Sequence, residues 1–352
     1  MTPQTRPGLP EVDPYVSPQL DVAVRLNANE CPRRLPDAFF ETLATVVREL
    51  PLNRYPDGQM THLREKLAER AGHSFEGTWT ANGSNEILTE LLLAYGGPGH
   101  KAVVFQPTYM LHSRLTWLTH TSIVKFTLQP PFAIGARDVA AANGVKPHVA
   151  FVCSPNNPTG NAQSLEAIKR LAQGSDALVV VDEAYIEFGG ETSQPLIEQH
   201  PNVVVVRTLS KAFALAGARI GYCLADPEVV QNLQRVRLPY HMSSLTQAAG
   251  IAALKHAGEA ESLLDGIRAE RDRLVEALSR MNGVTVYPSQ ANFVLFTPPN
   301  GTSGKRVWQA LLDRGVLVRD LTAMVPDALR VTAGTTEEVG RFLEALEEAL
   351  AA

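Results

Sequence analysis

The sequence lacks the features that mark secreted, membrane-spanning and nucleic-acid-binding proteins. Its three cysteines are widely separated among 352 residues, so neither a disulfide framework nor a zinc cluster is expected. No stretch approaches the ~18 uninterrupted apolar residues that cross a bilayer, and the proline-rich N-terminus has no apolar core of a secretion signal. No block of Lys or Arg stands out, and the net charge is −5. We therefore expect a cytoplasmic protein with no membrane and no nucleic-acid partner.

The length and the order of hydrophobic patterns predict an arm and two domains. A chain of 352 residues is long for a single hydrophobic core. Residues 1–30 are interrupted by prolines and should form an extended arm. In residues 31–238, helical patterns alternate with short β-branched runs, which is typical of crossover units on a mostly parallel sheet flanked by helices. Residues 239–352 have long helical patterns before short strands, which predicts a smaller α+β domain.

The hydrophobic period places the individual elements. Helical patterns cover residues 37–50, 62–71, 87–95, 110–117, 165–172, 245–256 and 259–281, with a last helix from 337. Strand patterns cover residues 102–105, 123–126, 149–152, 178–181, 203–206, 284–287, 293–296, 316–319 and 329–331. Residues 97–102 fit a loose dinucleotide-binding glycine pattern, but they follow a helix and enter a strand, the reverse of such a site. This order argues against a dehydrogenase.

Lys211 is the most informative residue. It follows the β-branched run at 203–206 and lies between Ser210 and Arg219. An amine at the end of a buried strand can form a Schiff base with an aldehyde beside a phosphate if desolvation or a neighbouring cation lowers its pKa. Taken alone, Lys211 would more often be a solvated surface lysine at a strand end, so the other motifs decide.

Three further motifs suit such a site. Asp182 and Glu183 follow the run at 178–181, and carboxylates at the carboxyl edge of a sheet suggest a ligand crevice. Asp182 should be partly desolvated and need a donor partner, although an N-cap aspartate is the alternative. Residues 154–160 form a rigid Asn-Pro turn at a strand end. Residues 83–85 begin a helix and can bind an anion, or Ser84 can be a simple N-cap.

These groups match the needs of pyridoxal 5′-phosphate: an amine, a carboxylate for the ring nitrogen, a donor to the phenolic oxygen and a phosphate site. The sequence resembles the fold-type I aminotransferases and, among them, the histidinol-phosphate aminotransferases. The resemblance covers nearly the whole chain and is carried by the strings LNANE (26–30), RYP (54–56), SPNNPTG (154–160), DEAYIEF (182–188), RTLSKAFALAGAR (207–219) and LRVT (329–332). It implies a fold-type I transferase fold.

The resemblance also implies roles around the cofactor ring. Lys211 would form the Schiff base and then move the proton between substrate and cofactor. Asp182 would pair with the ring nitrogen, while Asn157 and Tyr185 would hydrogen-bond the phenolic oxygen. Tyr109 would lie against the ring face.

Further implied roles concern phosphate, substrate and a second subunit. Tyr55 would reach the cofactor phosphate of the neighbouring subunit, so the enzyme would be a homodimer. The cofactor phosphate would otherwise be held by Ser84, Asn85, Ser210 and Arg219. The substrate would be bound by Tyr15, Asn157, Arg319 and Arg330, the two arginines gripping its acidic group.

The implied reaction is transamination of L-histidinol phosphate with 2-oxoglutarate, giving imidazole-acetol phosphate and glutamate in histidine biosynthesis. An aromatic-amino-acid aminotransferase or a phospho-threonine decarboxylase of the same fold are alternatives, because fold does not fix the substrate. Two positions depart from the family pattern. Cys31 stands where asparagine is usual, and His241 stands where proline is frequent. We interpret His241 as a surface or packing residue rather than a substrate contact.

Overall fold

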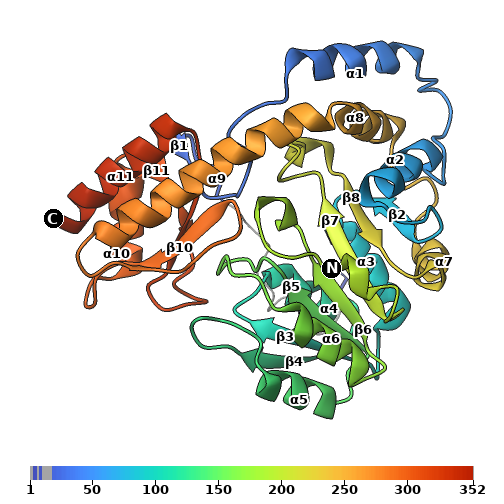
Figure 1. Ribbon diagram of the computed structural model, residues 1–352, viewed down its shortest axis with the longest axis horizontal. Helices are drawn as coiled ribbons and strands as arrows, with labels where there is room; N and C mark the ends of the chain where they lie inside the picture. The colour runs from blue at the N-terminus through green and yellow to red at the C-terminus, as the bar shows by residue number, and fades with distance from the viewer. Residues whose placement is uncertain (1–2, 6–7, 10–17, 352) are drawn as a thin grey trace.

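A computed structural model describes residues 3–5, 8–9 and 18–351 of the chain, arranged around a large central sheet and a smaller one (Figure 1). The large sheet has the strand order β2-β8-β7-β6-β5-β3-β4. Only β8 runs antiparallel to its neighbours, which confirms the predicted mostly parallel sheet. Its strands are β2 (Thr78–Ala81), β3 (Lys101–Gln106), β4 (Ser122–Thr127), β5 (Val149–Cys153), β6 (Leu178–Asp182), β7 (Val203–Thr208) and β8 (Gly221–Leu224).

Helices cover the large sheet. Both β5 and β6 are buried along their whole length, as expected for strands covered on two faces. Local signals set the helix starts: Ser164 caps α6 through its side chain, and Asp226 caps α7 just before a proline at the first helical position. The helices are α2 (Thr61–Ala71), α3 (Ser84–Tyr95), α4 (Met110–Leu118), α5 (Ala136–Gly144), α6 (Leu165–Gln173) and α7 (Pro227–Val236).

The smaller sheet lies beside α9, α10 and α11 (Figure 1). Its antiparallel order is β12-β13-β10-β9. The strands are β9 (Thr285–Val286), β10 (Phe293–Thr297), β12 (Arg319–Asp320) and β13 (Leu329–Thr332). The helices of this half are α8 (Ser244–Lys255), α9 (Ala257–Arg280), α10 (Gly304–Asp313) and α11 (Thr336–Ala351).

One predicted strand is wrong. Residues 316–319 do not form a single strand but divide into β11 (Val316–Leu317) and β12, which belong to different sheets. β11 pairs in parallel with β1 (Val24–Arg25), so part of the N-terminal arm joins the C-terminal half. The chain then crosses through α1 (Asp37–Glu49), which packs on α8 (Figure 1).

The strand order creates a crevice. From β3 the chain adds β4 on one side and β5 on the other, and the carboxyl ends of strands at such a switch point are where open α/β sheets bind ligands. Three short helices, η2 (Ile186–Phe188), η3 (Gln194–Leu196) and η4 (Ala216–Ala218), lie in the segments that follow β6 and β7. Within the described residues, no helix combines the length and apolar character needed to cross a bilayer.

Candidate functional site

A cavity of about 430 Å³ opens at the carboxyl ends of β3, β5, β6 and β7 and is closed by residues of the smaller sheet. Almost all the predicted site residues line it, although they come from segments far apart in sequence. They are Ser84, Asn85, Tyr109, Asn157, Asp182, Tyr185, Ser210, Lys211, Arg219, Arg319 and Arg330.

Lys211 lies just after β7 at the floor of this cavity. Its Nζ donates to the carbonyl of Ala28 at 3.2 Å and stands over the Tyr185 ring, 5.9 Å from the centroid. Desolvation lowers the pKa of Lys211 to about 8, and the nearby guanidinium groups of Arg330 and Arg219 act in the same direction. A substantial fraction of the amine is therefore neutral near physiological pH, as a nucleophile requires.

Asp182 ends β6 and is 2% exposed. Its Oδ2 lies 3.1 Å from Nε2 of His112 on α4, and its Oδ1 accepts the backbone N–H of Ala184 at 3.2 Å. The His112 ring is fully buried and stacks on Phe151 with centroids 4.8 Å apart. The sequence predicted that a desolvated aspartate here needs a donor partner, and that partner is a histidine. His112 fixes the carboxylate at the edge of the cavity.

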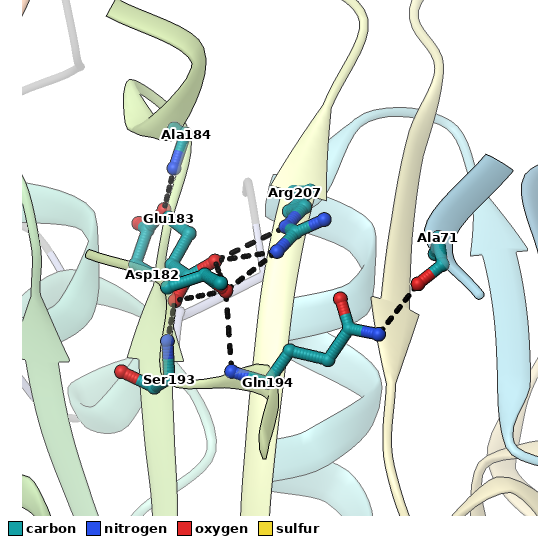
Figure 2. Close-up of polar contacts among 8 residues, drawn as sticks. Ala71, Asp182, Glu183, Ala184, Ser193, Gln194 and Arg207 are labelled. Atoms are coloured by element: carbon teal, nitrogen blue, oxygen red, sulfur yellow. Dashed lines mark hydrogen bonds and ion pairs between the residues drawn. The ribbon is translucent and has the colours of Figure 1, made fainter. Parts of the chain in front are cut away.

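The second carboxylate of the pair points elsewhere. Successive residues at a strand end face opposite sides, and Glu183, unlike Asp182, does not line the cavity. Figure 2 shows its carboxylate beside Arg207 of β7. Its Oε2 accepts from Nε and Nη2 of Arg207 at 3.1 and 3.0 Å, and its Oε1 accepts from the backbone of Ser193. Burial raises the pKa of Glu183, while Arg207 opposes the rise. Glu183 therefore braces the strand end instead of lining the site.

Tyr185 and Asn157 meet inside the cavity. The Tyr185 hydroxyl accepts a hydrogen bond from Nδ2 of Asn157 at 3.4 Å and one from Nδ2 of Asn29 at 3.0 Å. Its ring packs edge-on against Phe293 of β10, 5.1 Å between centroids. Burial raises the pKa of Tyr185, so the phenol stays protonated and can donate.

An anion site forms where α3 begins. The first N–H groups of a helix have no partner within it, and here they belong to Ser84 and its neighbour at the cavity wall. A Cβ at Gly83 would lie 2.5 Å from Nη2 of Arg219, and a Cβ at Gly221 would lie 2.2 Å from the Ser84 nitrogen. These glycines therefore let a guanidinium and a helix start approach each other closely. Arg219 also donates to Oγ of Ser210 at 3.3 Å.

The smaller sheet contributes a second cationic site to the cavity. Arg319 and Arg330 are directly paired across β12 and β13, and both line the cavity. Arg330 is 7% exposed and donates to Oδ1 of Asn157 at 2.5 Å and to the carbonyl of Asn27 at 2.9 Å. Like charges placed opposite each other repel, so the pair suits an acidic ligand between them.

Of the predicted site residues that the structure describes, Tyr55 does not line this cavity. Tyr55 is 81% exposed and stacks on Tyr240, with centroids 4.6 Å apart. Tyr15 lies outside the described residues. His241 stacks on Trp79 at 5.7 Å and bonds the carbonyl of Thr80 at 3.2 Å, away from the cavity.

His112 and Asn29 contact side chains of the site, but no role was assigned to them from the sequence. His112 could have been suspected only from its place in the first turn after Tyr109, which gives no hint of Asp182. Asn29 belongs to the LNANE string, but its contact with Tyr185 spans the two halves of the molecule.

Known proteins match both the sequence and the fold. The family model for aminotransferases of class I and II matches residues 22–346. The histidinol-phosphate aminotransferase of Thermobifida fusca is 46% identical, covering 95% of this chain and 92% of its own. The Streptomyces avermitilis enzyme of that name is also 46% identical, with coverage of 95% and 93%. Among solved structures, the histidinol-phosphate aminotransferase of Sinorhizobium meliloti in complex with pyridoxal-5′-phosphate superposes with a TM-score of 0.87 at 24% identity. The match covers 99% of each chain.

The chain is therefore an aminotransferase of the class I and II family. The fold likeness agrees with the predicted fold-type I architecture. Within this class, the full-length identity to the curated relatives shows that the chain belongs to the histidinol-phosphate aminotransferase family.

Proposed function

We propose that this protein transfers the amino group of L-histidinol phosphate to 2-oxoglutarate with the help of pyridoxal 5′-phosphate, giving imidazole-acetol phosphate and glutamate in histidine biosynthesis. The observation that carries the proposal is the cross-strand pair of Arg319 and Arg330, which faces the same cavity as Lys211. One site must bind a phosphate and then a dicarboxylate, and two adjacent guanidinium groups offer both of them bidentate hydrogen bonds.

The residues present fit the cofactor. The α3 start and Arg219, which approach closely only because positions 83 and 221 are glycines, would hold its phosphate. Asp182, whose carboxylate the His112 ring holds in place, would pair with the ring nitrogen. Tyr185 and Asn157 would bond the phenolic oxygen, and Tyr109 would cover the ring. When bound, pyridoxal phosphate supplies an aldehyde that condenses with amines and a ring that withdraws electrons from the carbon bearing the nitrogen.

The chain's own groups move the proton. The pKa of Lys211 is lowered to about 8, so its Nζ can take a proton from the substrate Cα. The same amine can then deliver that proton to C4′ of the cofactor. The carbonyl of Ala28 accepts from the same amine and holds it at the cavity floor. The guanidinium pair fixes the far end of the substrate, so the Cα–H bond is presented to Lys211 in a constant position.

We also propose a homodimer. Tyr55 stacks on Tyr240, and exposed apolar side chains stand close to both in sequence, at Leu52 and Leu238. An exposed aromatic pair of this kind is typical of a surface that a partner covers. In the dimer, Tyr55 would reach the partner's cofactor phosphate, and Tyr15 would close over the substrate.

The domain division and the location belong to the same proposal. Residues 31–238 form the cofactor-binding domain and residues 239–352 the smaller one, with residues 1–30 as an arm that pairs with the smaller domain through β1. The arginine pair then sits on one domain and Lys211 on the other. The protein would act in the cytoplasm.

A half-reaction tests the function. Cofactor-loaded protein is mixed separately with L-histidinol phosphate, tyrosine, phenylalanine and O-phospho-threonine, and the visible absorbance of the cofactor is followed. We expect rapid bleaching with L-histidinol phosphate and recovery on adding 2-oxoglutarate. Bleaching by tyrosine but not by L-histidinol phosphate would indicate an aromatic-amino-acid aminotransferase. Release of carbon dioxide from O-phospho-threonine would indicate the decarboxylase.

A further inference from the structure

Residues 27–29 form a short wall that touches three polar groups of the cavity. The first carbonyl accepts from Arg330 at 2.9 Å, and the second accepts from Lys211 at 3.2 Å. At the third position, Nδ2 of Asn29 donates to the Tyr185 hydroxyl at 3.0 Å. Backbone atoms make the first two contacts, so only at Asn29 does the contact depend on the side chain.

The hydrogen bonds around Asn29 fix which way its amide points. Its backbone N–H donates to Oγ1 of Thr332 at 3.0 Å, and that hydroxyl sends its proton to Oδ1 of Asn29 at 3.3 Å. The amide nitrogen is left to face Tyr185. The same logic orients Asn157, because its Oδ1 accepts from Arg330 and its Nδ2 faces Tyr185.

The Tyr185 hydroxyl therefore accepts from two amides at once. A phenol has one proton to donate, and neither amide nitrogen can take it. The proton must point away from both, toward the open side of the hydroxyl, which is the cavity. Asn29 makes the shorter of the two contacts and is 1% exposed, so it holds this arrangement more firmly than Asn157.

We propose that Asn29 is a positioning residue that keeps the Tyr185 hydroxyl proton aimed at the phenolic oxygen of the bound cofactor. The inference rests on the proposed function, since it takes pyridoxal phosphate as the group that Tyr185 faces. A donor to the phenolic oxygen stabilises the negative charge on that oxygen. It therefore lowers the affinity for the proton that the oxygen shares with the lysine nitrogen. The pH midpoint of the cofactor's visible absorbance measures that affinity.

The test uses a variant suited to the backbone. Asn29 has a φ of 54°, in the left-handed region, where glycine is accommodated without strain. Asn29→Gly removes the amide donor, so the Tyr185 hydroxyl can rotate, and we expect the absorbance midpoint of the holoenzyme to rise by about 0.5 to 1 pH unit. In a Tyr185→Phe background the same change should have no further effect.

The matched control is Asn292→Ala. Asn292 donates to the backbone carbonyl of Asn29 at 3.2 Å, so its loss disturbs the same segment without touching Tyr185. We expect this variant to lower thermal stability and leave the midpoint in place. An unchanged midpoint in Asn29→Gly, or an equal shift with and without the Tyr185 hydroxyl, would overturn the inference.

A second variant guards against misfolding. Asn29→Asp keeps the shape of the side chain but presents an acceptor, which draws the Tyr185 proton away from the cavity. Its midpoint shift should be larger with Tyr185 present than in the Tyr185→Phe background, and equal shifts contradict the role of Asn29. If the wild-type protein shows no pH-dependent visible absorbance after pyridoxal phosphate is added, the proposed function itself is overturned, and this inference with it.

Discussion

Nε2 of His112 lies 3.1 Å from Oδ2 of Asp182, and both side chains are shut off from solvent. The histidine is a donor to a carboxylate whose other hydrogen bond, among the described residues, comes from the backbone N–H of Ala184. Without this hydrogen bond from His112, the carboxylate would lose a contact that fixes its orientation at the edge of the cavity, where we propose that it meets the ring nitrogen of the cofactor. We therefore propose that His112 acts on the cofactor through Asp182.

Replacement of His112 by Phe should lower the rate of the half-reaction and weaken cofactor binding. A lost hydrogen bond to a charged group typically costs about 1.5–3 kcal/mol, which corresponds to roughly a 10- to 150-fold effect. His112→Gln, which keeps a donor, should retain more activity. Absorbance titration with pyridoxal phosphate and stopped-flow mixing with substrate measure the two effects. His62→Gln on an exposed face is the control, and a His112→Phe variant that matches it would show that the pair is only structural.

Lys211→Ala should keep the cofactor and lose turnover. The phosphate site at α3 and Asp182 remain intact, so equilibrium dialysis should still detect bound cofactor. The proton carrier is gone, and a positioned general base typically contributes about 10²- to 10⁴-fold. Lys66→Ala, an exposed lysine on α2, is the control. Activity near that of the wild type would refute the assigned role.

Arg319→Ala should impair the use of both acidic substrates while leaving the cofactor spectrum unchanged. Arg319 is paired with Arg330 in register but does not share its bonds to Asn157 and Asn27, so its removal disturbs the cavity less. We expect KM for L-histidinol phosphate and 2-oxoglutarate to rise about 10- to 100-fold. Steady-state kinetics and an absorbance spectrum suffice. A variant that cannot bind the cofactor would contradict the role of Arg319 in substrate binding. The control is Arg306→Ala, which changes an exposed arginine of α10.

Local patterns accounted for most of the large sheet because its buried strands are continuous apolar runs, as at Leu178–Asp182. The strand β8 escaped prediction because Gly221–Leu224 is short and begins with glycine. The division of residues 316–319 between two sheets also escaped it. Only the pairing with β1, almost 300 positions away, determines where the chain changes sheets.

The site residues divide in the same way, into those that a local pattern predicts and those that depend on a distant partner. Asp182 ends a strand, and Asn157 and Lys211 lie shortly after strands; each belongs to a distinctive string, so the sequence itself points to them. His112 and Asn29 act through partners on other elements, and no local pattern encodes such a distance. Of the two carboxylates at the end of β6, Asp182 was assigned a role from the sequence and Glu183 was not. The pleat of the strand separated them, placing Asp182 in the cavity and Glu183 on Arg207.

Glu90 gives a prediction for stability against pH. This residue of α3 is 3% exposed, and its Oε2 accepts from Nε1 of Trp79 at 2.9 Å. Burial raises its pKa from 4.5 to about 8, against the opposing effect of the Trp79 bond. Between these two values the folded protein binds a proton that the unfolded chain releases. This group therefore stabilises the fold fully below about pH 4.5, and its contribution is lost as the pH rises toward about 8.

Glu90→Gln should remove that dependence. The free energy of unfolding of the wild type should fall relative to the variant by at most about 1.4 kcal/mol per pH unit across this window, and the two curves should run parallel above it. Urea unfolding at equal protein and cofactor concentrations, from about pH 5 to about pH 9, measures the difference. Glu65→Gln, on an exposed face of α2, should show no such divergence. Parallel curves for the wild type and Glu90→Gln throughout would mean that the buried carboxyl is ionised in the folded protein, with Arg237 as the nearby cation able to compensate it.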